Sequence, residues 1–173
     1  MPVFYSISNN FKKSITMKTK SMNFTKCVIT MAFMLFATTA FSQSTNIVDD
    51  EKAIKAVIQS AYIDGLQNWG EITEIEAGFH PSFELLTKTK DNQIKKLPIG
   101  DWIEMVKNRK AQNPDGPPAL VTAKILDVDI TIDAAAVKLD LFRENKKLFT
   151  DYLLLYKFDE GWRIVGKIYY RLP

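Results

Sequence analysis

The chain has 173 residues, a length that suits one domain of ordinary size better than two. Its 46% hydrophobic, 25% charged and 12% aromatic residues are typical of a globular protein and exclude a wholly disordered chain. A single cysteine excludes an intramolecular disulfide, and a single histidine leaves no ligand set for a structural zinc ion. We therefore expect no metal site and no bound cofactor.

The first 42 residues have the composition of an export signal. They carry five lysines and no acidic residue, and residues 27–41 form an apolar run shorter than the ~20 residues that span a bilayer as a helix. Small residues at its end predict cleavage before Gln43, which makes the protein periplasmic or extracellular, with no stable membrane span after cleavage. The alternatives are an N-terminal membrane anchor or a buried helix. We interpret residues 1–21 as a mis-assigned start or a poorly ordered extension.

Cleavage changes the charge of the protein. Without residues 1–42 the number of Lys and Arg falls from 23 to 18 while all 20 acidic residues remain, so the net charge goes from +3 to −2. The pairs Lys95-Lys96 and Lys146-Lys147 lie near predicted turns. We interpret them as solvated side chains rather than as recognition patches. Without a basic stripe, we expect no nucleic-acid partner.

Three amphipathic helices and one strand hairpin are predicted in the first part of the mature domain, which we place at residues 46–173. The first helix has apolar residues at spacings of three and four and acidic residues at its start, where they suit the helix dipole. Asp49 or Asp50 is its candidate N-cap, and Asp101 is the candidate N-cap of the third helix. The expected ranges are 46–67 and 71–77 for the first two helices, 83–86 and 94–99 for the hairpin, and 100–112 for the third helix.

Four β-rich segments separated by short polar turns follow, and they predict an antiparallel meander. One face of this sheet must receive the helices, because their apolar stripes need cover. We expect a homodimer through the other face, with scattered apolar residues on a solvated face as the alternative. The strand ranges are 119–132, 135–143, 147–158 and 161–171, and the residues expected on the outer face are Leu153, Leu155, Val165 and Tyr169.

Four local strings add to this order of elements: YIDG at residues 62–65, FHPSF at 79–83, GDWIE at 100–104 and YKFDEGWRI at 156–164. Together they resemble the secreted "putative lumazine-binding" branch of the nuclear-transport-factor-2-like, or cystatin-like, superfamily over about residues 48–171. The resemblance implies an α+β domain with a curved, mainly antiparallel sheet around three helices, a conical pocket, and usually a homodimer. It implies no reaction, because the superfamily includes isomerases, dehydratases, polyketide cyclases and pure binding modules.

Two residues are candidates for acid–base chemistry. His80 is the only histidine, and imidazole is the side chain that titrates near pH 7 without a large shift. The alternative is a loop histidine that fixes a turn by bonding to the backbone. Asp64, near the end of the first helix, is the weaker candidate and is better suited to bonding nearby backbone. Asp127 and Asp129 share one strand face, and two neighbouring carboxylates can raise the pKa of one of them. The simpler interpretation is that this face is solvated.

Aromatic side chains on the elements expected around the cone are the candidate ligand pocket, with core packing as the alternative. They are Tyr62, Trp69, Phe79, Trp102, Tyr156, Trp162 and Tyr170. We therefore predict a secreted small-molecule-binding or interaction module, non-catalytic, whose ligand is a small apolar or aromatic molecule. The alternative is a polyketide-cyclase-like or isomerase-like enzyme with His80 as acid or base and Tyr62 or Tyr170 as hydrogen-bond donor.

Overall fold

The computed structural model describes residues 47–173, so the predicted leader and the cleavage site before Gln43 lie outside the described part of the chain. Residues 47–57 form an α-helix that continues directly as the π-helix η1 (Ile58–Gln67). The other elements are α2 (Ile72–Gly78), β1 (Phe79–Lys88), β2 (Ile94–Pro98), α3 (Ile99–Gln112), β3 (Val121–Thr131), β4 (Ala134–Arg143), β5 (Lys146–Phe158) and β6 (Gly161–Arg171). No helix within residues 47–173 has the length and apolar character needed to cross a bilayer.

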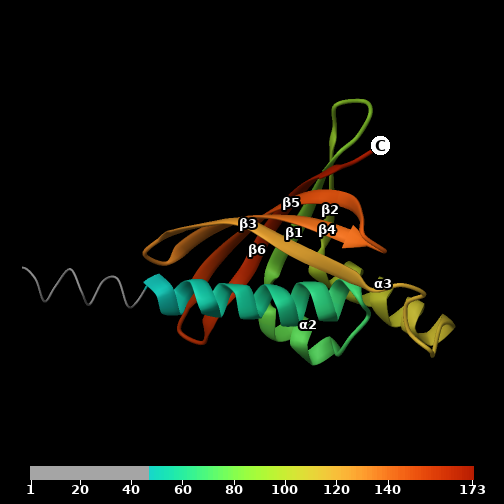
Figure 1. Ribbon diagram of the computed structural model, residues 1–173, viewed down its shortest axis with the longest axis horizontal. Helices are drawn as coiled ribbons and strands as arrows, with labels where there is room; N and C mark the ends of the chain where they lie inside the picture. The colour runs from blue at the N-terminus through green and yellow to red at the C-terminus, as the bar shows by residue number, and fades with distance from the viewer. Residues whose placement is uncertain (1–46) are drawn as a thin grey trace, which may run out of the picture. The chain divides into compact units, whose positions relative to one another are not determined.

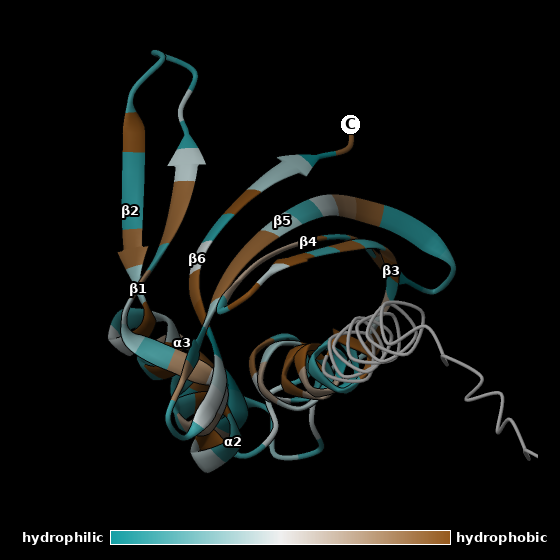
Figure 2. Ribbon diagram, turned by 90° about the vertical axis from the view of Figure 1, so that its left-hand side faces the viewer, coloured by the Kyte–Doolittle hydropathy of each residue, from teal (hydrophilic) through white to brown (hydrophobic). Residues whose placement is uncertain are grey.

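The six strands form one sheet in the order β2-β1-β6-β5-β4-β3. Strands β3 to β6 make the predicted antiparallel meander, and the β1–β2 hairpin joins it through a parallel pairing of β1 with β6. The long first helix lies along one side of this sheet (Figure 1), and Figure 2 shows the sheet curving over the helices. The prediction of an α+β fold, with three helices on a curved and mainly antiparallel sheet, is confirmed.

The helix N-caps differ from those predicted. Helix α3 begins at Ile99 with Pro98 at the N-cap position and without a side-chain cap, so the assignment of Asp101 as N-cap is wrong. Pro98 is extended and its fixed φ leads directly into the first turn, where the Asp101 carboxylate lies near the positive end of the helix dipole. The first helix is already formed at residue 47, which places Asp49 and Asp50 inside it rather than at its cap.

Asp50 instead ties the first helix to the hairpin between β5 and β6. Its Oδ1 accepts hydrogen bonds from Lys157 Nζ at 2.6 Å and from Trp162 Nε1 at 2.9 Å. The hydrogen bonds from Lys157 and Trp162 hold the pKa of Asp50 below its ordinary value. The carboxylate therefore stays ionised and anchors the helix to the sheet.

The other end of the first helix is tied to the edge strand β3 by Asn68. The Asn68 amide Nδ2 donates to the Val121 carbonyl at 2.9 Å, and the Val121 N–H donates to Asn68 Oδ1 at 2.7 Å. This pair of hydrogen bonds imitates the pairing of a neighbouring strand and satisfies both backbone groups of the buried Val121. It fixes η1 beneath the end of the sheet where β3 begins.

The side chains of β5 that face the helices are the opposite set from the one we expected. Leu153 is 0% exposed and Leu155 is 1% exposed, so both lie in the core and not on the outer face. Alternation separates a strand into two sets of side chains but does not say which set faces the helices. The outward face carries a different group of large apolar and aromatic residues, namely Tyr152, Leu154, Tyr156, Ile168 and Tyr170.

Candidate functional site

A pocket of about 260 Å³ opens on the helix side of the sheet, and we call it the inner pocket. It lies between η1, α3, the β1–β2 hairpin and strands β4 to β6, so that every layer of the fold contributes to its wall. Six of its lining residues are apolar, namely Leu66, Leu85, Leu97, Met105, Leu141 and Phe149. The other six are polar, amphipathic or charged, namely Gln67, Trp102, Arg109, Lys167, Tyr169 and Arg171.

Lys167 connects the inner pocket to a buried polar network. Its Nζ donates to the Tyr62 hydroxyl at 2.5 Å and lies 3.0 Å from Asp151 Oδ2. The Tyr62 hydroxyl in turn donates to Asp151 Oδ2 at 2.5 Å. Tyr62 and Asp151 are fully buried and Lys167 is 6% exposed, so the three groups interact with little screening by water.

Aromatic rings surround the same ammonium group. Lys167 Nζ lies 4.9 Å from the centre of the Tyr62 ring, 5.1 Å from that of Tyr169 and 5.6 Å from that of Trp102. These distances are within the range of cation–π attraction, which favours the charged form of the lysine. Asp151 favours the charged form as well, while burial acts in the opposite direction.

Burial and charge perturb two members of the network. Burial lowers the pKa of Lys167 against the opposing effect of Asp151. Burial, reinforced by the negative charge of Asp151, raises the pKa of Tyr62 well above its ordinary value. The hydroxyl of Tyr62 therefore remains protonated, and it passes a hydrogen bond from Lys167 on to the carboxylate.

A β-bulge in β6 places Lys167 on this side of the sheet. Leu154 pairs with Gly166 and Leu155 pairs with Ile164, so Val165 has no partner on β5. The extra residue inverts the alternation beyond it. Trp162 and Ile164 are therefore buried before the bulge, and Lys167 is buried after it.

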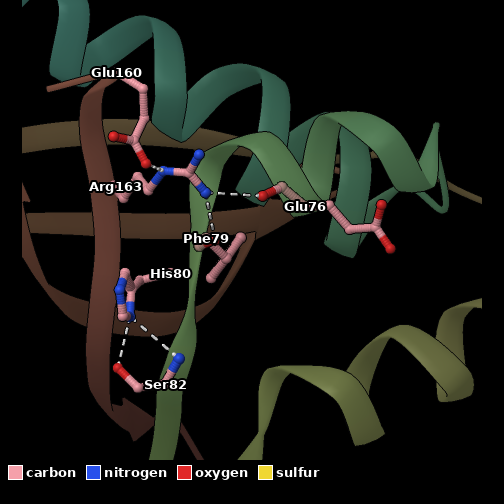
Figure 3. A network of polar contacts seen from close by, with 6 residues as sticks. All are labelled: Glu76, Phe79, His80, Ser82, Glu160 and Arg163. Atoms are coloured by element: carbon pink, nitrogen blue, oxygen red, sulfur yellow. Dashed lines mark hydrogen bonds and ion pairs between the residues drawn. The ribbon is translucent and has the colours of Figure 1, made fainter. Parts of the chain in front are cut away.

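The structure places His80 outside the inner pocket, at the start of β1 (Figure 3). Its Nδ1 accepts the Ser82 backbone N–H at 3.2 Å and lies 2.6 Å from Ser82 Oγ, and its ring stacks on Phe158 with centroids 4.9 Å apart. Arg163 on β6 contacts the carbonyl oxygens of Glu76 and Phe79 near by. His80 therefore bonds to the backbone at the beginning of β1, whereas the alternative interpretation placed it in a loop.

Asp64 also lies away from the inner pocket. Its side chain is exposed, and its Oδ1 accepts a hydrogen bond from Gln59 Nε2 at 2.9 Å on the same helix. The carboxylates of Asp127 and Asp129 lie on the outward face of the sheet, where they line a separate groove of about 410 Å³. Among residues 47–173, no acidic side chain lines the inner pocket.

The seven aromatic residues predicted for the pocket separate into three groups. Trp102 lines the inner pocket, and Tyr62 reaches it through its hydrogen bond with Lys167. Phe79 and Trp162 are buried in the core, and Trp69 packs against it half-buried. Tyr156 and Tyr170 are 50% and 64% exposed on the outward face, because they belong to the sets of β5 and β6 that point away from the helices.

One residue of the site, Asp151, carries a sequence signal that our prediction did not use. Asp151 stands in the same alternating set as Leu153 and Leu155, and a lone acid in an apolar set indicates a buried polar partner. Lys167 has no comparable signal, since the Val165 bulge conceals which way it points. Tyr169 was predicted on the outer face, and the same bulge turns it inward to line the pocket.

Comparisons with known proteins agree with this fold. The sequence model of a family described as putative lumazine-binding matches residues 49–170. Similar solved structures include NTF2-like proteins of unknown function from Shewanella baltica (24% identity, TM-score 0.57, covering 73% of this chain and 96% of that one) and Methylobacillus flagellatus (26%, 0.55, 73% and 94%). An NTF2-like protein with a cystatin-like fold from Novosphingobium aromaticivorans is also similar (14%, 0.58, 78% and 89%). No curated protein matches the chain.

Proposed function

The chain belongs to the putative lumazine-binding family of nuclear-transport-factor-2-like proteins, and on that premise we propose that it binds a small, flat organic molecule in the inner pocket. The observation that carries this proposal is the composition of the pocket wall. Leucine side chains surround a hollow into which Trp102, Tyr169 and the buried Lys167 also project. Apolar walls with a few convergent polar groups are typical of ligand sites.

The size of the inner pocket limits the ligand. Its volume of about 260 Å³ lies just below the roughly 300–1,000 Å³ of pockets that enclose drug-sized molecules. A single bicyclic heterocycle such as lumazine is of suitable size, whereas riboflavin is considerably larger. We expect the pocket to distinguish the two by size.

Binding rather than catalysis fits the position of the one histidine. A general base must come within hydrogen-bond reach of the group that it deprotonates. His80 lies outside the inner pocket, and its Nδ1 already accepts a hydrogen bond from Ser82. The alternative of an enzyme that uses His80 has no support from this geometry.

Calorimetric titration of the purified protein with lumazine and with riboflavin tests the proposal. We expect heat of binding with lumazine and none with riboflavin. Leu97→Trp, which adds bulk to the pocket wall, should abolish the lumazine signal, while Leu126→Trp on the exposed side of β3 should leave it unchanged. Lumazine binding that survives Leu97→Trp would place the site elsewhere, and no binding by any flat heterocycle of this size would contradict the proposal.

We also propose that the protein is exported and forms a homodimer. Export is supported by the lysine-rich leader and the short apolar run that precedes Gln43. The dimer is supported by the apolar and aromatic side chains on the outward face of β5 and β6, which a second copy of the chain would cover. Mass spectrometry of the mature N-terminus tests the first of these statements.

A further inference from the structure

The charged side chains around the inner pocket are all basic. Arg109 comes from the last turn of α3, and Lys167 and Arg171 come from β6. Asp151 neutralises Lys167, whereas neither arginine forms an ion pair within residues 47–173. The wall of the pocket therefore carries an excess of positive charge on a domain whose net charge we expect to be slightly negative.

Lys167 has hydrogen-bonding capacity left at the boundary of the pocket. An ammonium group has three N–H donors, and two of those of Lys167 are directed to the Tyr62 hydroxyl and Asp151 Oδ2. In the described part of the chain the third donor has no hydrogen-bond partner. Because Lys167 is only 6% exposed, an oxygen that accepts this hydrogen bond would stabilise a charge that water reaches poorly.

The remaining wall suits the body of a planar molecule. Trp102 and Tyr169 are both near the Lys167 ammonium, and Phe149 meets Tyr169 edge to face with centroids 5.6 Å apart. These rings offer apolar faces to a ligand whose polar end points toward Lys167. The pocket thus separates a cationic end from an aromatic wall.

We infer that the ligand of the inner pocket is a small aromatic or unsaturated carboxylate, held at Lys167 and attracted by Arg109 and Arg171. This inference rests on the proposed function and narrows it to one chemical class. The carboxylate accepts the third N–H of Lys167, and the two exposed arginines supply attraction that weakens as salt is added. A neutral ligand of the same shape gains only the contacts with the aromatic wall.

Benzoate and benzamide are the matched probes, because they share size and shape and differ in charge. We expect calorimetry at low ionic strength to give benzoate an affinity about tenfold or more above that of benzamide, a preference that shrinks as salt is added. Arg109→Gln and Arg171→Gln should each weaken benzoate binding several-fold and so lower the ratio of benzoate affinity to benzamide affinity. The control Lys124→Gln removes the same charge from an exposed position of β3 and should leave both affinities unchanged.

The results separate this inference from the proposed function. Equal affinity for the two probes, or an effect of Lys124→Gln as large as that of the arginine variants, would overturn the carboxylate assignment. Lumazine binding without benzoate binding would also overturn it and would leave the binding proposal intact. Failure of lumazine, benzoate and benzamide together would remove both. Lys167→Met, checked for folding by circular dichroism, should abolish the preference for benzoate.

Discussion

Among the single residues of the site, Lys167 and Asp151 form a buried ion pair that is energetically expensive. Removing two charges from water costs several kcal/mol for each ion, and the attraction offsets this cost only with good geometry and further hydrogen bonds. Here Tyr62 supplies a bridging hydroxyl, and three aromatic rings surround the ammonium. Asp151 Oδ1 nevertheless has no hydrogen-bond partner within residues 47–173. A pocket function accounts for such a pair better than stability alone does.

The two charges of this pair should be strongly coupled in their effect on stability. We expect Lys167→Met and Asp151→Leu each to lower the free energy of unfolding by about 3–5 kcal/mol, because each leaves an unpaired buried charge. The double variant removes both charges and should cost clearly less than the sum of the single variants. Chemical denaturation of the four proteins measures this difference.

An exposed ion pair provides the control for this cycle. Lys107 and Glu104 lie 2.7 Å apart on α3, with side chains that are 48% and 64% exposed. Water screens exposed pairs, so they contribute little to stability and the corresponding single and double variants should be nearly additive. Additive effects at Lys167 and Asp151 as well would show that the buried pair is not coupled as the geometry indicates.

The first helix packs closely against α2, and this packing positions Tyr62, which lies in the π-helix η1. Helix α2 crosses η1 at a point where both helices have a glycine. A Cβ on Gly65 would lie 2.6 Å from Ile75 Cγ1, and a Cβ on Gly78 would lie 2.3 Å from Ala61 Cβ. Both distances are too short for ordinary carbon contacts, so the glycines allow the two helices to approach.

Gly78→Ala should therefore destabilise the protein by about 1–3 kcal/mol, the usual cost of overpacking a core. Gly100→Ala is the matched control, because Gly100 also lies in a helix but has no atom within 4 Å of the position that an added methyl group would take. Alanine there should be neutral or should stabilise by about 0.4–1 kcal/mol through the unfolded state. Thermal unfolding of both variants measures the contrast, and equal melting temperatures would contradict the role given to Gly78.

The two faces of the sheet have different surroundings in the whole molecule. The inner face is covered by the helices and contributes to the inner pocket. The outward face leaves large apolar and aromatic side chains exposed, among them Leu154 at 54% and Ile168 at 53%. Exposed apolar patches of this kind are more often association surfaces than the rest of a protein's surface is.

If this face joins two copies, Leu154→Glu should convert the dimer to a monomer, because it buries an unpaired carboxylate in the interface. Thr122→Glu, at an exposed position of β3, should leave the dimer intact. Light scattering at micromolar concentration gives the mass, and circular dichroism confirms that both variants are folded. A monomeric parent protein, or a dimer that persists in Leu154→Glu, would remove the outward face as the interface.

Local patterns were sufficient for most of the fold. The first helix was expected at 46–67 and is helical over residues 47–67, and the predicted strands of the meander agree with β3 to β6 within a few residues. Helical and strand periodicities are properties of consecutive residues, so they are visible without the tertiary structure. The start of β1 was expected at residue 83 and lies at Phe79, because Phe79 pairs with Ile164 of β6 before the register shifts ahead of Glu84.

The order and type of the elements, the α+β class and the resemblance to a family follow from local patterns of consecutive residues. Which face of each strand meets the helices, and which residues form the site, depends on how the strands pair in the folded protein. Tyr62 contacts Asp151 and Lys167 across 89 and 105 residues of chain, and the bulge at Val165 turns Lys167 toward them. Such contacts depend on strand register, in which one inserted residue reverses every side chain beyond it.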